Sequence, residues 1–120
     1  MVASKVSTRA VVEQLNERAV EYLEVVRVPP MSVGVFALPK GGVDRQTPHA
    51  EDEIYYAIRG RARFRAGGKE MGVGPGDVLF VPAREEHRFH DIEEALELLV
   101  VFAPAESSGD NLEFREKGKG

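Results

Sequence analysis

Cysteine is absent from this 120-residue sequence, which excludes disulfide bonds and thiolate metal ligands. The sequence also lacks any run near the roughly 20 apolar residues that a membrane-spanning helix needs. Its beginning, MVASKVSTRAVVEQLNERAV, lacks the unbroken apolar stretch of a signal peptide. Basic residues are not in excess, since the formal net charge is −4 and no long basic run is present. We therefore expect a cytoplasmic protein whose partners include neither membranes nor nucleic acids.

The composition is that of an ordinary globular protein, with 42% hydrophobic and 30% charged residues. The chain is long enough for one domain with a substantial core, and no repeat or linker divides it. We expect that domain to have three parts. These are a helix and a leading strand over residues 1–30, a strand-rich body over residues 31–104, and a polar tail over residues 105–120. Leu112 and Phe114 are the candidates for docking the tail.

Apolar residues recur at helical spacing near the N-terminus: Val11, Val12, Leu15, Ala19, Tyr22 and Leu23. This periodicity predicts an amphipathic helix from about Thr8 to about Arg18. The following segment, YLEVVRV, is rich in β-branched residues, so the point where helix gives way to strand is left open. Pro29 and Pro30 end whichever element precedes them.

Short strand-like runs alternate with glycine- and proline-rich turns in the rest of the chain. The expected strands are MSVGVFAL, EIYYAIR, ARFRA, VLFVP, HRFHD and LELLVVFAP. Gly60 is expected to break the second of these strands from the third. Strands that recur every 8–12 residues or so are typical of a β-sandwich or barrel.

Metal-ligand side chains gather ahead of one strand, in the segment TPHAEDEIYYAIRG. His49 and Glu53 would stand about 13 Å apart on a continuous strand, so they can share an ion only if the chain reverses between them. If the chain does not reverse there, residues 47–53 are only a polar turn between two strands. A third candidate, His87, opens a later strand beyond Pro82. Two histidines and one carboxylate on neighbouring strands form a facial ligand set. Such a set suits one divalent transition metal: iron, manganese, nickel, copper or zinc.

These two stretches resemble the two sequence motifs of the cupin superfamily. In the first motif, Glu53 and Gly60 have the expected six-residue gap, and His49 falls on the second histidine position. Thr47 stands where the motif has its first histidine. In the second motif, Gly76, Pro82 and His87 fall on their positions, whereas Arg84 replaces a glycine and Asp91 an asparagine. The resemblance covers residues 31–104. This span is also similar to small single-domain bacterial cupins, which have a type-2 conserved barrel.

The resemblance implies an all-β double-stranded β-helix, a cupin or jelly-roll barrel, preceded here by a short N-terminal helix. It also implies a metal held by three histidines and one glutamate, of which this chain keeps His49, Glu53 and His87. The fourth place is expected to hold water or the Thr47 hydroxyl, with Gln46 and Glu51 as alternatives, and Thr47→His is expected to strengthen metal binding. Small cupins commonly form homodimers. The apolar residues Val11, Leu15 and Tyr22 also favour a homodimer. A closed barrel has little room to bury them, so a second subunit could supply the surface that they need.

The expected ligand is a small organic molecule held inside the barrel. The expected aromatic walls are Phe36, Tyr55, Phe80 and Phe89. Arg59 and His90 are weaker candidates for holding an anion or moving a proton, because alternation places the arginines of this strand on an outer face and turns His90 away from His87. Three functions stay open. They are a metal-dependent enzyme such as a dioxygenase or isomerase, a non-enzymatic binding or sensing module, and a metal-free ligand-binding barrel.

Overall fold

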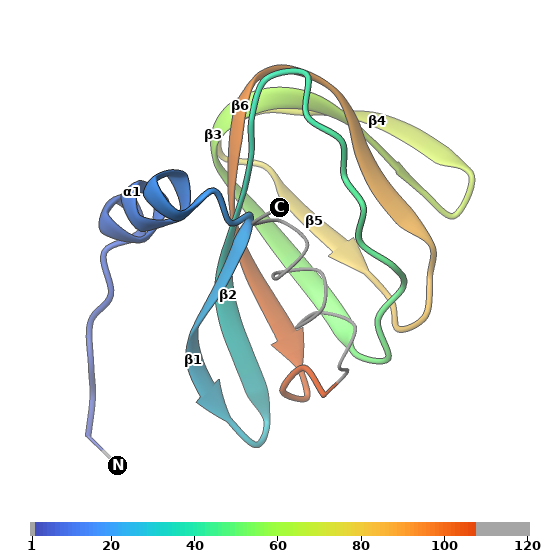
Figure 1. Cartoon of the computed structure of the whole chain (residues 1–120). Coiled ribbons are helices and arrows are strands. Elements are labelled where there is room, and N and C mark those ends of the chain that lie inside the picture. Colours follow the sequence, from blue (N-terminus) through green and yellow to red (C-terminus); the bar gives the residue numbers. More distant parts are fainter. Residues whose placement is uncertain (1, 108–120) are drawn as a thin grey trace.

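Two long antiparallel strands run through the molecule and bend over together in Figure 1: β3 (Asp52–Ala66) and β6 (His87–Ala103). The structure, a computed structural model, describes residues 2–107, so Leu112 and Phe114 lie outside the described residues. Gly60 lies where the register between β3 and β6 shifts, with φ of 96°, and a Cβ there would be 2.2 Å from the carbonyl oxygen of Ala95. The strand break expected at Gly60 is therefore wrong. The chain bends there without ending the strand, and HRFHD and LELLVVFAP likewise belong to the single strand β6.

Four shorter strands complete the fold: β1 (Tyr22–Val28), β2 (Met31–Leu38), β4 (Lys69–Val73) and β5 (Val78–Val81). The sheet order is β1-β2-β6-β3-β4, with β5 also paired to β3, and every pairing is antiparallel. Because β3 and β6 bend, one continuous sheet closes around a single interior (Figure 1). This is the expected all-β barrel, and the loop of residues 39–51 runs along it from β2 to β3 (Figure 1).

The helix α1 (Thr8–Arg18) has the predicted bounds. The Ser7 side chain caps it by accepting a hydrogen bond from the backbone N–H of Ala10 at 3.3 Å, and Ala19 ends it in a left-handed conformation. Its apolar face packs on the outside of the sheet, in a cluster of Val11, Val12, Leu15, Val20 and Val35. No helix within residues 2–107 is long and apolar enough to cross a membrane.

This packing removes one argument for a homodimer. Leu15 is only 2% exposed within a single chain, and Val11 and Tyr22 are also buried. These three side chains are therefore covered by their own chain. The expectation that they need a second subunit is wrong, because Val11 and Leu15 pack on the outer face of the sheet and Tyr22 packs inside the barrel.

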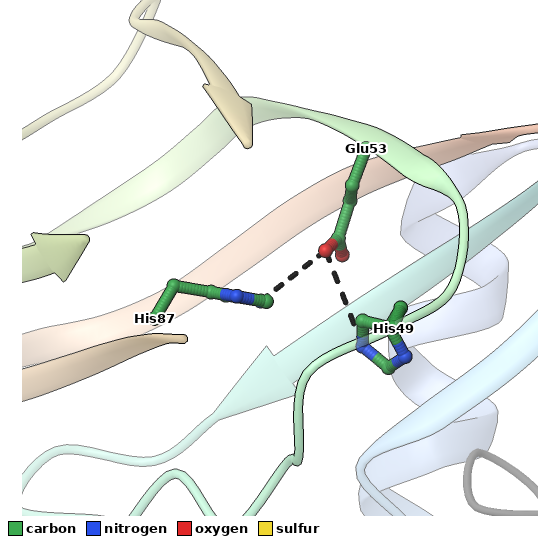
Figure 2. Close-up of side chains that lie close together, drawn as sticks. All are labelled: His49, Glu53 and His87. Atoms are coloured by element: carbon green, nitrogen blue, oxygen red, sulfur yellow. Dashed lines mark ion pairs between the residues drawn. The ribbon is translucent and has the colours of Figure 1, made fainter. Parts of the chain in front are cut away.

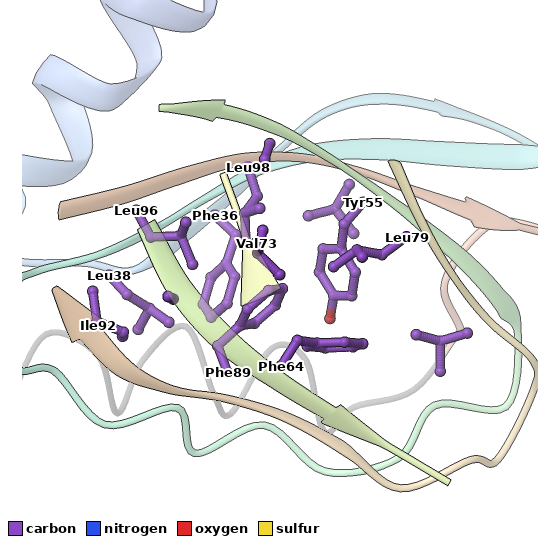
Figure 3. Packing of buried hydrophobic residues seen from close by; sticks show 14 of the residues in the cluster. Phe36, Leu38, Tyr55, Phe64, Val73, Leu79, Phe89, Ile92, Leu96 and Leu98 are labelled. Atoms are coloured by element: carbon purple, nitrogen blue, oxygen red, sulfur yellow. The ribbon is translucent and has the colours of Figure 1, made fainter. Parts of the chain in front are cut away.

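The barrel interior is filled mainly by aromatic and aliphatic side chains (Figure 3). Phe64 and Phe89 stack with ring centroids 4.6 Å apart, and Tyr55 meets Phe89 edge-on at 5.0 Å. Phe36, Tyr55 and Phe89 are therefore interior residues, as expected. Phe80 is not, because it lies on the outward face of β5 and is 61% exposed. The filled interior leaves the polar residues of the barrel gathered at one end.

Candidate metal centre

Three side chains of types that can hold a metal ion converge near the start of β3 and of β6: His49, Glu53 and His87, hereafter the ligand cluster (Figure 2). Glu53 is the second residue of β3, and His87 is the first residue of β6. His49 lies in the loop before β3, where a bend at residues 50–51 turns its side chain back toward Glu53. The expected chain reversal is present, although His49 does not end a strand.

The distances within the ligand cluster are those of groups that can share an ion. Oε1 of Glu53 lies 3.2 Å from Nε2 of His87 and 4.0 Å from Nε2 of His49. One ligand atom from each of the three residues lies within 4.8 Å of the other two. Two donors that each lie about 2.1 Å from a metal are about 3.0 Å apart at a right angle and about 4.2 Å apart in line. Both distances from Oε1 of Glu53 fall in this range.

Backbone contacts between two loops hold the ligand cluster together. The backbone N–H of Arg84 donates to the carbonyl oxygen of His49 at 2.6 Å, and that of Ala83 donates to Oδ1 of Asp52 at 2.9 Å. Arg84 has φ of 67°, a left-handed conformation that favours glycine, and it occupies the glycine position of the second motif. These contacts join the loop before β3 to the loop that leads into His87.

The donor set fits a metal ion. All three residues are buried, and the Glu53 carboxylate forms ion pairs with His87 and His49. These histidines pair with it as cations only when protonated, whereas a metal ion would balance the buried charge without a proton. His87 donates from Nδ1 to the carbonyl oxygen of Glu85 at 2.9 Å. This hydrogen bond is typical of metal-binding histidines, because it fixes the ring and directs Nε2 to the ion.

The two histidines of the ligand cluster differ in their affinity for protons. Burial lowers the pKa of His49, although the charge of Glu53 opposes this effect. Burial also acts to lower the pKa of His87. Its close contact with Glu53 and the charge of that carboxylate outweigh burial, so the net pKa of His87 is raised. A proton in the metal-free site therefore resides on His87 in preference to His49.

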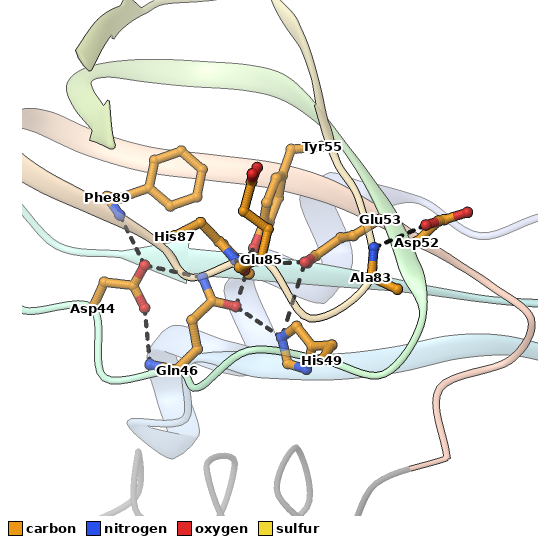
Figure 4. A network of polar contacts seen from close by, with 10 residues as sticks. All are labelled: Asp44, Gln46, His49, Asp52, Glu53, Tyr55, Ala83, Glu85, His87 and Phe89. Carbon is orange, nitrogen blue, oxygen red and sulfur yellow. Dashed lines mark hydrogen bonds and ion pairs between the residues drawn. The ribbon is translucent and has the colours of Figure 1, made fainter. Parts of the chain in front are cut away.

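A buried polar network borders the ligand cluster (Figure 4). The Tyr55 hydroxyl donates to Oε1 of Gln46 at 3.0 Å and lies 3.0 Å from Nε2 of His87. Nε2 of Gln46 donates to Oδ2 of Asp44 at 2.9 Å, and the same oxygen accepts from the backbone N–H of Phe89. Complete burial, together with the charges of Glu53 and Asp44, raises the pKa of Tyr55 well above its ordinary value. Asp44 was not expected from the sequence, where it reads as one polar residue in a turn-rich loop.

The remaining candidates lie outside the ligand cluster. Thr47 is exposed, so it does not occupy the place that the motif gives to a histidine. Glu51 is buried, but its Oε2 accepts hydrogen bonds from the backbone N–H and hydroxyl of Ser107. Arg59 is exposed, and His90 lies outside the barrel between Glu70 and Asp91. Arg59 and His90 therefore cannot act inside the barrel in this conformation.

The cavity inside the barrel that borders Glu53 is small. A cavity of about 10 Å³ is bordered by residues of the network and the barrel wall: Tyr22, Phe36, Gln46, Glu53, Tyr55, Val100 and Phe102. This is room for about one water molecule. Close by, the last described segment crosses the chain, where the backbone N–H of Glu106 donates to Oγ of Ser32 and Ser107 binds Glu51. The cavity at Glu53 and Tyr55 is thus too small for anything larger than water.

Comparison with known proteins agrees with this fold. Residues 34–102 match the family model described as the cupin domain, so the chain belongs to the cupin family. An uncharacterized protein of Streptomyces coelicolor is 48% identical over 86 residues, which cover 72% of this chain and 82% of that protein.

Two solved structures extend the comparison. The TT1209 protein of Thermus thermophilus superimposes with a TM-score of 0.68 at 25% identity, over 85% of this chain and 99% of that one. The DMSP lyase DddQ of Ruegeria pomeroyi DSS-3 gives a TM-score of 0.60 at 26% identity, over 63% of this chain. This chain spans only 39% of the lyase. The double-stranded β-helix barrel is thus shared with proteins of differing size.

Proposed function

We propose that the chain binds one divalent transition metal ion through the ligand cluster and acts there, as a metal-dependent enzyme, on a small organic molecule. The observation that carries the proposal is the convergence of His49, Glu53 and His87, because three buried ligand atoms lie together and the Glu53 carboxylate faces the two histidine rings. The enzyme named among the structural neighbours, a lyase, supports a catalytic use of such a barrel.

A bound iron, manganese, nickel, copper or zinc ion would supply Lewis acidity and open coordination positions for the organic molecule. The residues of the chain supply the surroundings. Phe36, Phe89 and Phe102 form an apolar wall that excludes bulk water and strengthens the few polar contacts inside. Tyr55 keeps its proton because its pKa is raised, so its hydroxyl remains a hydrogen-bond donor beside His87.

A second function, a metal-binding barrel without catalysis, is favoured by the cavity of about 10 Å³ beside the ligand cluster. An organic ligand requires part of the mouth to move. We expect residues 105–107 to be that part, because a few hydrogen bonds to Ser32 and Glu51 hold them there. An enzyme needs this opening, whereas a metal-binding barrel does not.

Elemental analysis of protein purified without a histidine tag tests metal binding. We expect about one transition metal per chain, as for any mononuclear site. His87→Ala should abolish binding, whereas His90→Ala, which alters the exposed histidine beside Glu70, should leave it unchanged. Failure to retain metal after soaking with each candidate ion would overturn the proposal and favour a metal-free barrel.

A second measurement separates the enzyme from the binding module. Protein loaded with ferrous iron is mixed with a panel of bidentate oxygen compounds, including diketones, catechols and hydroxy acids, and both oxygen uptake and product formation are followed. Turnover that is lost in His87→Ala supports an enzyme. Tight binding of one compound without turnover of any supports the non-catalytic function.

A further inference from the structure

The loop before β3 presents alternate residues to the barrel interior, and this alternation does not follow the cupin motif. Asp44 and Gln46 are buried, whereas Arg45 is exposed. The two residues that follow, Thr47 and Pro48, are both exposed. The interior side that the motif assigns to position 47 is therefore occupied by Gln46, one residue earlier. Gln46 thus takes the interior place of the histidine that the motif has at position 47.

The Gln46 side chain has the geometry of a ligand. Its Oε1 lies 3.2 Å from Nε2 of His49, close to the separation of about 3.0 Å between adjacent donors around one metal ion. Its Nε2 donates to the Asp44 carboxylate at 2.9 Å. Because a carboxylate only accepts, this hydrogen bond identifies the amide nitrogen and turns Oε1 toward the ligand cluster. An amide carbonyl oxygen suits manganese and similar ions.

We infer that Oε1 of Gln46 is the fourth protein ligand of the metal site, an assignment that rests on the proposed function. In the metal-free protein, His49 donates its Nε2 proton to this oxygen. Binding of an ion at Nε2 would require the neutral imidazole to carry its proton on Nδ1 instead, so this hydrogen bond would be exchanged for shared coordination. Tyr55 can still donate to the second lone pair of Oε1. Asp44 is a positioning residue, because it holds the amide and touches no ion.

This assignment reverses an expectation drawn from the motif. Thr47→His should not strengthen metal binding, because the side chain at position 47 faces solvent. Gln46→His should preserve binding, because it places an imidazole on the interior side. Four protein ligands leave two positions in an octahedral shell, which still admits a bidentate organic ligand.

The test uses Mn²⁺ as the probe on full-length, metal-free protein. Calorimetry gives the affinity, and water-proton relaxation counts the water molecules on the ion. We expect Gln46→Ala to weaken binding by about 10- to 100-fold, the range seen for residues that support metal sites, and to add one coordinated water. Gln46→Met keeps the side-chain volume but replaces the oxygen with a thioether, so it should behave like Gln46→Ala. Thr47→Ala is the matched control and should match the wild type.

The outcomes are distinguishable. Failure of the wild type to bind any metal overturns the proposed function and, with it, this assignment. Metal binding by the wild type that is unchanged in Gln46→Ala and Gln46→Met overturns the assignment alone. Weaker binding without an added water also overturns it, because Gln46 would then act only by positioning His49. Weaker binding with one added water in both variants supports it.

Discussion

Oε1 of Glu53 lies 3.2 Å from Nε2 of His87, and each side chain is only 1% exposed. In the metal-free protein this contact can bind a proton, and in the metal-bound protein the same two atoms can bind an ion. His49 differs, because its Nε2 is 4.0 Å from the same oxygen and burial lowers its pKa. The pKa values of the two histidines should therefore be shifted in opposite directions.

For the metal-free protein, we predict that His87 titrates above the ordinary histidine pKa of about 6.5 and His49 below it. A raised pKa means that the folded state binds the proton more tightly. The contribution of His87 to stability is then fully present below pH 6.5 or so and is lost as the pH rises through its folded-state pKa. For His49 the sign is reversed, and its neutral form favours folding as the pH rises toward about 6.5.

Nuclear magnetic resonance titration of the imidazole protons measures both values. Glu53→Gln should lower the pKa of His87 because it removes the charge that opposes burial. Glu94→Gln is the matched control, since that carboxylate is exposed and pairs with Arg61 outside the barrel. A pKa of His87 that is the same in the wild type and in Glu53→Gln would show that this contact does not control the titration.

The second prediction concerns the bend in β3. Gly60→Ala should cost about 3 kcal/mol or more, or prevent folding, because the new Cβ would overlap the Ala95 carbonyl and the residue would keep φ of 96°. Gly68→Ala is the control, with φ of 80° but open space around the Cβ, and should cost only about 1–2 kcal/mol. Urea unfolding of both variants gives the comparison. Equal costs would mean that backbone conformation alone, not the close approach of β6, requires glycine at position 60.

The third prediction concerns the packing of α1 on its own barrel. Leu15→Ala should reduce the free energy of unfolding by about 2–4 kcal/mol, because Leu15 is buried between the helix and the sheet. Glu17→Ala, on the exposed side of the helix, should change it by less than about 0.5 kcal/mol. Chemical denaturation at two protein concentrations is the measurement. A difference from the wild type that shrinks on dilution would instead place Leu15 between two subunits, because dilution removes the contribution of an interface.

Much of the fold could be predicted from the sequence, because its signals are local. The bounds of α1 follow from a serine cap and apolar residues at helical spacing, and the ligand cluster follows from motif spacing. A bend and a break look alike in the sequence, so the continuity of β3 through Gly60 could not be predicted. The short apolar run around Phe80 has no polar alternation, so the sequence does not show which of its side chains face outward.

The polar network could not be predicted for a different reason. Asp44 is 1% exposed because the backbone N–H of Phe89, 45 residues later in the chain, donates to it. No local pattern reveals such a partner. That Gln46 faces the interior, and Thr47 does not, depends in the same way on how the loop packs against the barrel. The residue types of the site can be read from the sequence, and the tertiary contacts select which of them point inward.

The last prediction concerns a homodimer, which we propose on a different surface from the one first expected. Four large apolar side chains lie together on the outer face of β3 and β5: Ile54, Tyr56, Val78 and Phe80. Strand pairing sets Ile54 beside Phe80 and Tyr56 beside Val78. Their exposed fractions run from 41% to 63%, which is high for a continuous apolar patch on a monomer.

A second copy fits this patch because a two-fold axis would place each apolar patch against its equivalent. β5 also pairs with β3 alone among the described strands, so its other edge can accept a strand. Light scattering at micromolar concentration should therefore report a dimer for the wild type and a monomer for Phe80→Asp. Val43→Asp places the same charge at a residue that is 64% exposed on the loop before β3, and it should remain a dimer. A monomeric wild type would exclude the homodimer, and a dimeric Phe80→Asp would place the interface on another surface.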